Sequence, residues 1–123
     1  MRFEKAEDIE ARVHTLVNRL DLKHVDPFRI KCFRSHGSKA RAYARIWSLP
    51  RVWQKALAVR PHYVIEVLSE HFDKQSFEEQ TKTLIHELLH IPKTFSGATR
   101  PHAFFDKKID RRAVEKYYAL LSG

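Results

Sequence analysis

Apolar residues recur every three to four positions in three stretches of this chain, which is the spacing of one buried helix face. The first stretch predicts a helix from about Ala6 to Leu22, and the last predicts a helix from about Asp106 to Leu121. The middle stretch begins after Ser76 and ends before Pro92. A shorter helix is expected from Pro50 to Leu57, because proline favours the first turn of a helix.

Three other stretches have the character of strands. Phe28 to Arg34 and Arg41 to Trp47 alternate apolar residues with basic or polar ones, as strands with one buried face do. The turn residues at 36–38 lie between these two runs and predict a hairpin. Tyr63 to Leu68 is a nearly continuous apolar run and gives the strongest strand signal in the chain.

The order of these elements predicts a small α+β domain that occupies residues 1–123. Its sheet is expected to hold three strands in a mixed or antiparallel arrangement. The N-terminal helix, the middle helix and the C-terminal helix are expected to pack with this sheet. A chain of 123 residues is long enough to form one hydrophobic core, and no linker divides it.

Composition narrows the class of protein. No apolar stretch reaches the roughly 18 residues that a membrane-spanning helix needs. Cys32 is the only cysteine, which excludes an internal disulfide and a multi-cysteine zinc finger or ribbon. The first residues are charged and lack the apolar core of a signal peptide. A cytoplasmic protein without membrane association is therefore expected.

The net charge of +8 is concentrated in one segment. Residues 27–65 hold nine of the 23 Lys and Arg residues and none of the 15 Asp and Glu residues. This asymmetry favours a polyanion such as DNA as a partner, with contacts from Arg41, Arg45 and Arg51. A solvated basic sheet face without a dedicated partner agrees with the charge equally well. Three aromatic residues of the segment are expected to pack in the core rather than to stack on bases; they are Tyr43, Trp47 and Trp53.

Residues 86–90 read His-Glu-Leu-Leu-His, which is the H-E-x-x-H pattern. Positions i and i+4 lie on one face of a helix, so His86 and His90 can bind the same metal ion. Glu87 is then placed to take a proton from water. Two imidazoles, a third ligand and a water suit a catalytic zinc ion. The alternative is a pair of structural histidines, because the motif is short and the chain holds eight histidines.

The local sequence predicts the helix that this motif requires. Ser76 to Glu79 has the S-x-x-E form of a capping box, which starts a helix. Pro92 ends the helical pattern two residues after His90. The apolar face between these limits is formed by Phe77, Thr81, Leu84, Ile85, Leu88 and Leu89.

A catalytic zinc site needs a third protein ligand in addition to the two histidines. The downstream residues that could supply it are His102, Asp106, Asp110 and Glu115. We expect His102, because Gly97 can provide the chain reversal that brings it back to the site. Pro101 would stiffen the approach and reduce the entropy lost on binding. Glu115, in the last predicted helix, is the main alternative.

A site of this kind would hydrolyse an amide bond. Glu87 would accept the proton of the water and pass it to the leaving amine. A further donor would stabilise the oxyanion, and the sequence does not choose among His62, Arg100, Tyr117 and Tyr118. If the strand at 63–68 is a sheet edge that borders the cleft, an extended peptide can pair with it.

The segments Tyr63–Val67 and Thr83–Pro92, followed by Gly97 and 100–102, closely resemble the metallopeptidase family found in phages and archaea. The order of elements is also similar to that of the SprT-like and WLM zinc peptidases, which act on DNA–protein crosslinks. The resemblance covers about residues 28–118. It implies a zincin-like fold, a zinc cofactor, Glu87 as general base, and a ligand set of His86, His90 and His102.

The chain departs from two related patterns. A metzincin would need glycine at position 93 and histidine at position 96, where this chain has Lys93 and Ser96. The zinc ribbon that often follows a SprT-like core is missing from this sequence. The leading hypothesis is a zinc-dependent endopeptidase for protein or peptide substrates, DNA-associated proteins included. The alternative is a basic nucleic-acid-binding module with a structural or vestigial metal site, and the oligomeric state is left open.

Overall fold

The computed structural model of the chain describes residues 1–98, 103–104, 107–108 and 111–121. No helix in these ranges is long and apolar enough to cross a membrane. Along the chain the elements are β1 (Arg2–Lys5), α1 (Glu7–Arg19), the 3-10 helix η1 (Pro27–Arg29), β2 (Ile30–His36), β3 (Ala44–Ser48), α2 (Arg51–Leu57), β4 (Tyr63–Leu68), α3 (Ser69–Phe72), α4 (Phe77–Leu88), β5 (Ala103–Phe104), β6 (Lys107–Lys108) and α5 (Arg111–Ala119).

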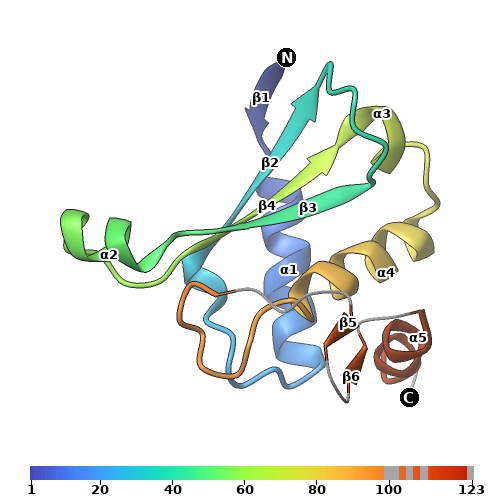
Figure 1. Cartoon of the computed structure of the whole chain (residues 1–123). Coiled ribbons are helices and arrows are strands. Elements are labelled where there is room, and N and C mark those ends of the chain that lie inside the picture. The colour runs from blue at the N-terminus through green and yellow to red at the C-terminus, as the bar shows by residue number, and fades with distance from the viewer. Residues whose placement is uncertain (99–102, 105–106, 109–110, 122–123) are drawn as a thin grey trace.

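The main sheet has four strands in the order β1-β2-β4-β3 (Figure 1). β2 and β4 are parallel, whereas β1 and β3 are antiparallel to their neighbours. The predicted α+β class with a mixed sheet is confirmed, and β1 adds a strand that the sequence analysis missed. The tetrapeptide Arg2–Lys5 is too short to show the alternation that identifies a strand. β5 and β6 form a separate two-stranded pair.

The predicted hairpin between Phe28–Arg34 and Arg41–Trp47 is wrong. Both β2 and β3 pair with β4, which lies between them. Burial explains this order, because Tyr63, Ile65 and Val67 of β4 have no exposed surface, and such a continuous apolar run belongs to a central strand. β4 is therefore a central strand. The edge of the sheet that lies beside α4 is formed by β3.

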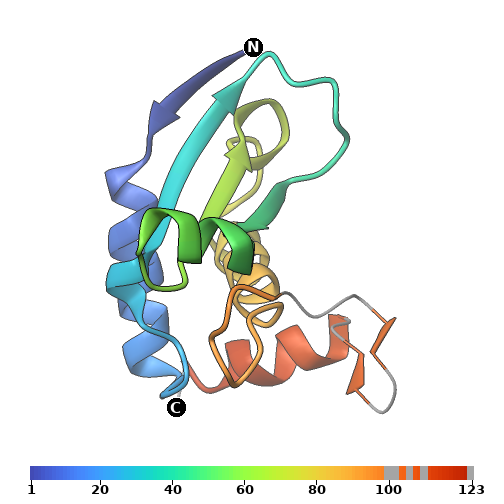
Figure 2. The same ribbon diagram turned by 60° about the vertical axis from the view of Figure 1, so that its left-hand side comes forward.

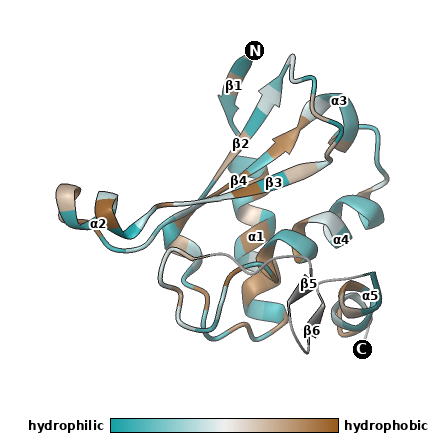
Figure 3. Ribbon diagram, in the orientation of Figure 1, coloured by the Kyte–Doolittle hydropathy of each residue, from teal (hydrophilic) through white to brown (hydrophobic). Residues whose placement is uncertain are grey.

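Helices α1 and α4 lie on one face of the sheet, and α5 packs against α4 (Figures 1 and 2). The core fills the space between these helices and the sheet, and includes Ile9, Val13, Cys32, Ile65 and Leu84. Figure 3 shows apolar positions along β4 and on α1, where the two elements enclose this core. The core thus fixes α4 beneath the β3 edge.

α2 projects from the end of the sheet as a short arm (Figure 1). The helix predicted near residues 50–57 is confirmed, although none of its residues is buried. Val52, Trp53 and Leu57 each expose more than half of their surface. The arm therefore adds little to the core.

Candidate metal centre

The H-E-x-x-H residues lie at the end of α4 and in the turn that follows it, and the first turn of this helix is capped. Ser76 Oγ accepts a hydrogen bond of 3.1 Å from Glu79 N, which confirms the predicted cap at this end. Leu84, Ile85 and Leu88 are buried in the core. Their burial fixes the rotation of the helix, so the neighbouring positions face the space beneath β3.

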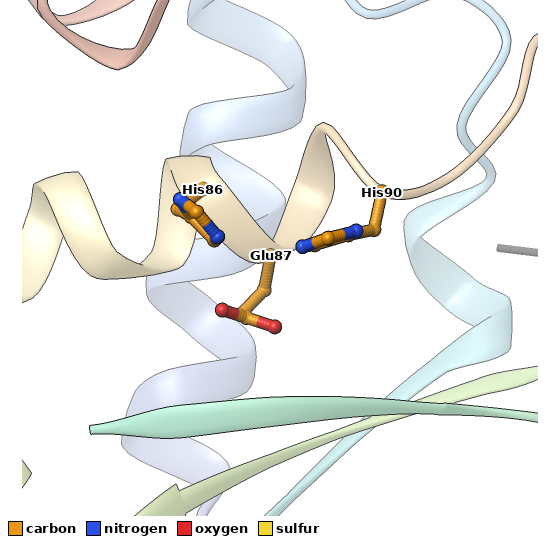
Figure 4. Close-up of side chains that lie close together, drawn as sticks. All are labelled: His86, Glu87 and His90. Carbon is orange, nitrogen blue, oxygen red and sulfur yellow. The ribbon is translucent and has the colours of Figure 1, made fainter. Parts of the chain in front are cut away.

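His86 and Glu87 lie in the last turn of α4, and His90 lies in the turn that follows. His90 N donates a hydrogen bond of 3.1 Å to Glu87 O, which keeps this turn close to helical. The potential ligand atoms of the three residues all lie within 4.8 Å of one another. Figure 4 shows the two imidazoles facing each other, with the Glu87 carboxylate extending toward the sheet. This spacing suits a single metal ion.

Burial gives the cluster its electrostatic character. Glu87 and His90 lie at the boundary of the core, and only 6% of the surface of each residue is exposed. Burial raises the pKa of Glu87 to about 8, because removal from water penalises the carboxylate. A cation beside this carboxylate would offset that penalty. Two imidazoles with an adjacent buried carboxylate therefore form a donor set that fits a divalent metal such as zinc.

A cleft of about 1240 Å³ opens from this cluster. One wall is the edge of the sheet from Ala42 to Ile46, and the other is the face of α4 that carries Glu79, Thr83 and His86. α5 closes part of the far side through Val114. The candidate metal centre thus lies on the wall of an elongated cleft rather than in a closed core.

The outer edge of β3 borders the cleft and pairs with no other strand among the described residues. Leu68 N donates a hydrogen bond of 2.9 Å to Tyr43 O, so alternate residues beginning with Tyr43 pair with β4. The backbone groups of Ala44 and Ile46 consequently point away from β4, toward the cleft. Pairing of a peptide with the strand at 63–68 was conditional on that strand being the edge beside the cleft, and the edge that borders the cleft is β3 instead.

The third ligand predicted from the sequence, His102, lies outside the described residues, as do Asp106 and Asp110. Glu115, the alternative, lines the cleft but does not join the cluster of His86, Glu87 and His90. Its Oε1 atom instead accepts a charged hydrogen bond of 2.8 Å from Lys82 Nζ. This ion pair competes with metal binding by Glu115.

The loop that leads toward position 102 is held by two side chains that the sequence analysis did not identify. The hydroxyl of Tyr63 donates to Ala98 O at 2.7 Å and accepts from Gly97 N at 3.0 Å. Gln54 Nε2 donates to Ser96 O at 3.1 Å. Gly97 has φ +95°, a left-handed backbone conformation that glycine adopts easily and that suits the chain reversal expected at this position. No local sequence pattern signals these contacts, because they join residues more than 30 positions apart.

Arg12 of α1 is a second residue that the sequence analysis missed. Its guanidinium donates to Gln80 Oε1 at 2.8 Å and to Thr81 Oγ1 at 2.9 Å. It also lies over the ring of Phe77, 4.0 Å from the centroid. These contacts attach the first half of α4 to α1. The sequence could not reveal them, because a basic residue on a helix face does not indicate which residues of another helix it will contact.

Three of the four candidate oxyanion donors do not line the cleft. Among the described residues, His62, Tyr117 and Tyr118 are absent from its lining, and Arg100 lies outside the described ranges. Tyr43 and His71 line the cleft instead, with their rings in edge contact at 6.5 Å. The sequence could not choose these two, because Tyr43 comes beside His71 only when β3 pairs with β4, the strand that leads into α3.

The basic and aromatic residues of segment 27–65 lie largely at the surface. Arg41 and Arg51 are exposed, and Arg45 is partly buried against Glu66. The expectation of core packing is wrong for the three aromatic residues to which it applied, since each exposes more than half of its surface; they are Tyr43, Trp47 and Trp53. β3 is an edge strand and α2 an arm, so neither element encloses its side chains.

The comparison with known families agrees with this geometry. A family model described as "putative phage metallopeptidase" matches residues 1–120. No curated protein and no solved structure matches the chain. The match includes β1 and the arm, and so extends beyond residues 28–118, the range of the resemblance noted from the motifs.

Proposed function

Because the chain belongs to the phage metallopeptidase family, we propose that it is a zinc-dependent endopeptidase with His86 and His90 among its metal ligands. The family implies a metal-dependent hydrolase of protein or peptide substrates. The observation that carries the proposal is the cluster of two imidazoles and one carboxylate within 4.8 Å, on the wall of a cleft that an extended chain can enter.

His86 and His90 would hold the ion, with His102 as the third ligand. A bound zinc ion lowers the pKa of water and polarises the carbonyl of the scissile bond. Glu87 adjoins both imidazoles but is better suited to proton transfer, because its carboxylate can accept a proton from a water held beside it. Its carboxylate would take one proton from the attacking water and give it to the amine that leaves.

The free edge of β3 would hold the substrate. An extended peptide that pairs with the backbone of Ala44 and Ile46 would lie along the cleft, beside Glu87 and His86. Strand addition uses backbone hydrogen bonds, which every substrate offers on both sides of the scissile bond. This mode of binding supports cleavage within a chain and requires a segment that is already unfolded or extended.

The direct test is cleavage of an unfolded protein such as reduced casein. The zinc-loaded chain is expected to produce internal fragments, to lose activity with a chelator and to regain it with added zinc. An intact substrate after long incubation with the fully zinc-loaded chain would refute the proposal. Release of single terminal residues alone would refute the endopeptidase assignment but leave a peptidase.

The ligand set is tested by zinc affinity in single alanine variants. We expect His86→Ala, His90→Ala and His102→Ala each to weaken zinc binding by about 100-fold or more. Glu115→Ala is the matched control, since Glu115 lines the same cleft but pairs with Lys82. If Glu115→Ala weakens zinc binding and His102→Ala does not, the third ligand is Glu115 rather than His102.

A further inference from the structure

The face of the main sheet opposite to α1 and α4, here called the outer face, has an ordered set of side chains. In one cross-strand row Lys5 pairs with Phe33, Phe33 with Glu66, and Glu66 with Arg45. In the next row Lys31 pairs with Val64 and Val64 with Trp47. Alternate residues of a strand point to opposite faces, and the intervening residues, such as Cys32 and Ile65, are in the core.

The outer face is apolar at its centre and accessible. Phe3 and Trp47 expose 57% and 53% of their surface. Together with Phe33 and Val64 they line a groove of about 570 Å³. Aromatic residues exposed together on one face of a sheet indicate a surface that binds a partner. The described part of the chain leaves this groove uncovered, as the exposure of its aromatic residues shows.

The charge of the outer face is positive. Glu66 is the acidic residue of the two cross-strand rows on the outer face, and only 2% of its surface is exposed. Its carboxylate accepts hydrogen bonds of 3.2 Å from Arg45 and of 2.9 Å from Trp47 Nε1. The charge of Glu66 is therefore compensated within the protein, and the exposed ammonium groups of Lys5 and Lys31 determine the potential at the rim. The hydrogen bond that Trp47 Nε1 donates to Glu66 also fixes the position of the indole ring.

We propose that the outer face binds single-stranded nucleic acid. Unstacked bases would stack on the rings of Phe3, Phe33 and Trp47, and phosphates would contact Lys5 and Lys31. Three observations favour this partner over an apolar protein surface: aromatic rings on an open sheet, cations at the rim, and the absence of acidic residues from segment 27–65. The site is separate from the metal centre, and its role does not depend on peptidase activity.

The test is titration of the zinc-loaded chain with fluorescent oligothymidylate of about 20 nucleotides, beside a duplex of equal length. Binding is expected to be tighter for the single strand, to weaken with salt and to quench tryptophan fluorescence. Trp53→Phe should retain this quenching, because Trp47 remains. Trp47→Phe should lose most of it, although Trp53 on the arm is equally exposed.

Matched variants separate the outer face from general charge. Lys5→Glu with Lys31→Glu is expected to weaken binding by about tenfold or more, whereas Lys23→Glu with Lys116→Glu, which changes the same charge elsewhere, should have less than a twofold effect. Phe3→Ala should weaken binding by about tenfold, and Phe28→Ala, at a phenylalanine of η1 that is even more exposed, should not. Glu87→Gln should bind normally.

Several results would overturn the proposal. One is absence of binding at low salt by a chain that retains its fold by circular dichroism. Equal affinity for duplex and single strand without quenching would indicate only general attraction between opposite charges. Equal losses in the two charge-reversed pairs, or quenching that follows Trp53, would place binding elsewhere. Self-association that Phe3→Ala prevents, without oligonucleotide binding, would make a second copy of the chain the occupant.

Discussion

Glu87 combines two properties that conflict in a folded protein, an ionisable carboxyl group and a buried position. In the absence of a cation, burial raises its pKa to about 8. At neutral pH the isolated carboxyl group therefore retains a proton that it would lose in the unfolded chain. A protein that keeps such a group accepts a loss of stability, which is common for residues with a catalytic role.

This conflict predicts the pH dependence of the metal-free protein. Below the ordinary pKa of 4.5, Glu87 is protonated in both states and has no effect on stability. As pH rises from there to about 8, the unfolded chain loses the proton first, so the free energy of unfolding falls and then levels off. Urea unfolding of metal-free wild type and Glu87→Gln should diverge over this range, reaching on the order of 2–4 kcal/mol in favour of the variant.

Parallel stability curves for the two proteins from pH 5 to pH 8 would contradict this prediction. Glu79→Gln is the control, because Glu79 lies on the same helix and lines the same cleft but is more exposed. Its curve should run parallel to that of the wild type. Saturating zinc should reverse the order of wild type and Glu87→Gln if the ion favours the carboxylate.

At the scale of elements, the side chain of Arg12 links α1 to α4. Arg12 makes two hydrogen bonds to side chains of α4 and one of 3.2 Å to Phe77 O. Arg12→Ala is expected to lower the free energy of unfolding by about 2–3 kcal/mol, because three bonds and a ring contact are lost. Lys23→Ala, which removes a surface ion pair with Asp21, should cost less than about 0.5 kcal/mol. Equal costs in chemical denaturation would show that Arg12 is not a structural link.

Gly97 and Gly37 form a natural pair for testing the loop before position 102. Both have positive φ, +95° and +88°. A Cβ on Gly97 would collide with the Gln54 amide and lie 2.6 Å from Leu49 O, whereas a Cβ on Gly37 would meet only Met1, at 3.5 Å. We expect Gly97→Ala to cost about 2–4 kcal/mol and Gly37→Ala about 1 kcal/mol. Zinc affinity should fall only in Gly97→Ala. An equal loss of stability in the two glycine variants would contradict the close packing of the loop around Gly97.

The elements differ in how far the sequence predicted them. α4 was predictable because its cap at Ser76 and its apolar spacing are local signals. The strand order was not, because β2 and β3 resemble a hairpin locally, and only burial places β4 between them. The cluster of candidate metal ligands was predictable as a spacing on a helix. The residues that hold the surrounding loop, Tyr63 and Gln54, act through contacts that no local pattern reveals.

At the scale of the whole molecule, the proposed metal centre connects function to stability. The cluster joins the end of α4 to the loop that follows it, so an ion bound there would stabilise the folded state alone. Zinc at 100 times its dissociation constant should add about 2.7 kcal/mol, which raises the melting temperature by about 10 °C for a domain of this size. Calorimetry with and without a chelator measures this shift. His90→Ala should abolish it, and a shift that persists in this variant would place the stabilising ion elsewhere.

The measurement closest to the central claim is cleavage of reduced casein by wild type and Glu87→Gln at equal zinc content. Zinc per chain is determined by mass spectrometry on the same samples. We expect one zinc in each protein, internal cleavage by wild type, and a rate at least about 100-fold lower in the variant, because a neutral amide cannot accept the proton of water. Equal rates at equal zinc content would contradict the role of Glu87, and with it the account of this cleft as a peptidase site.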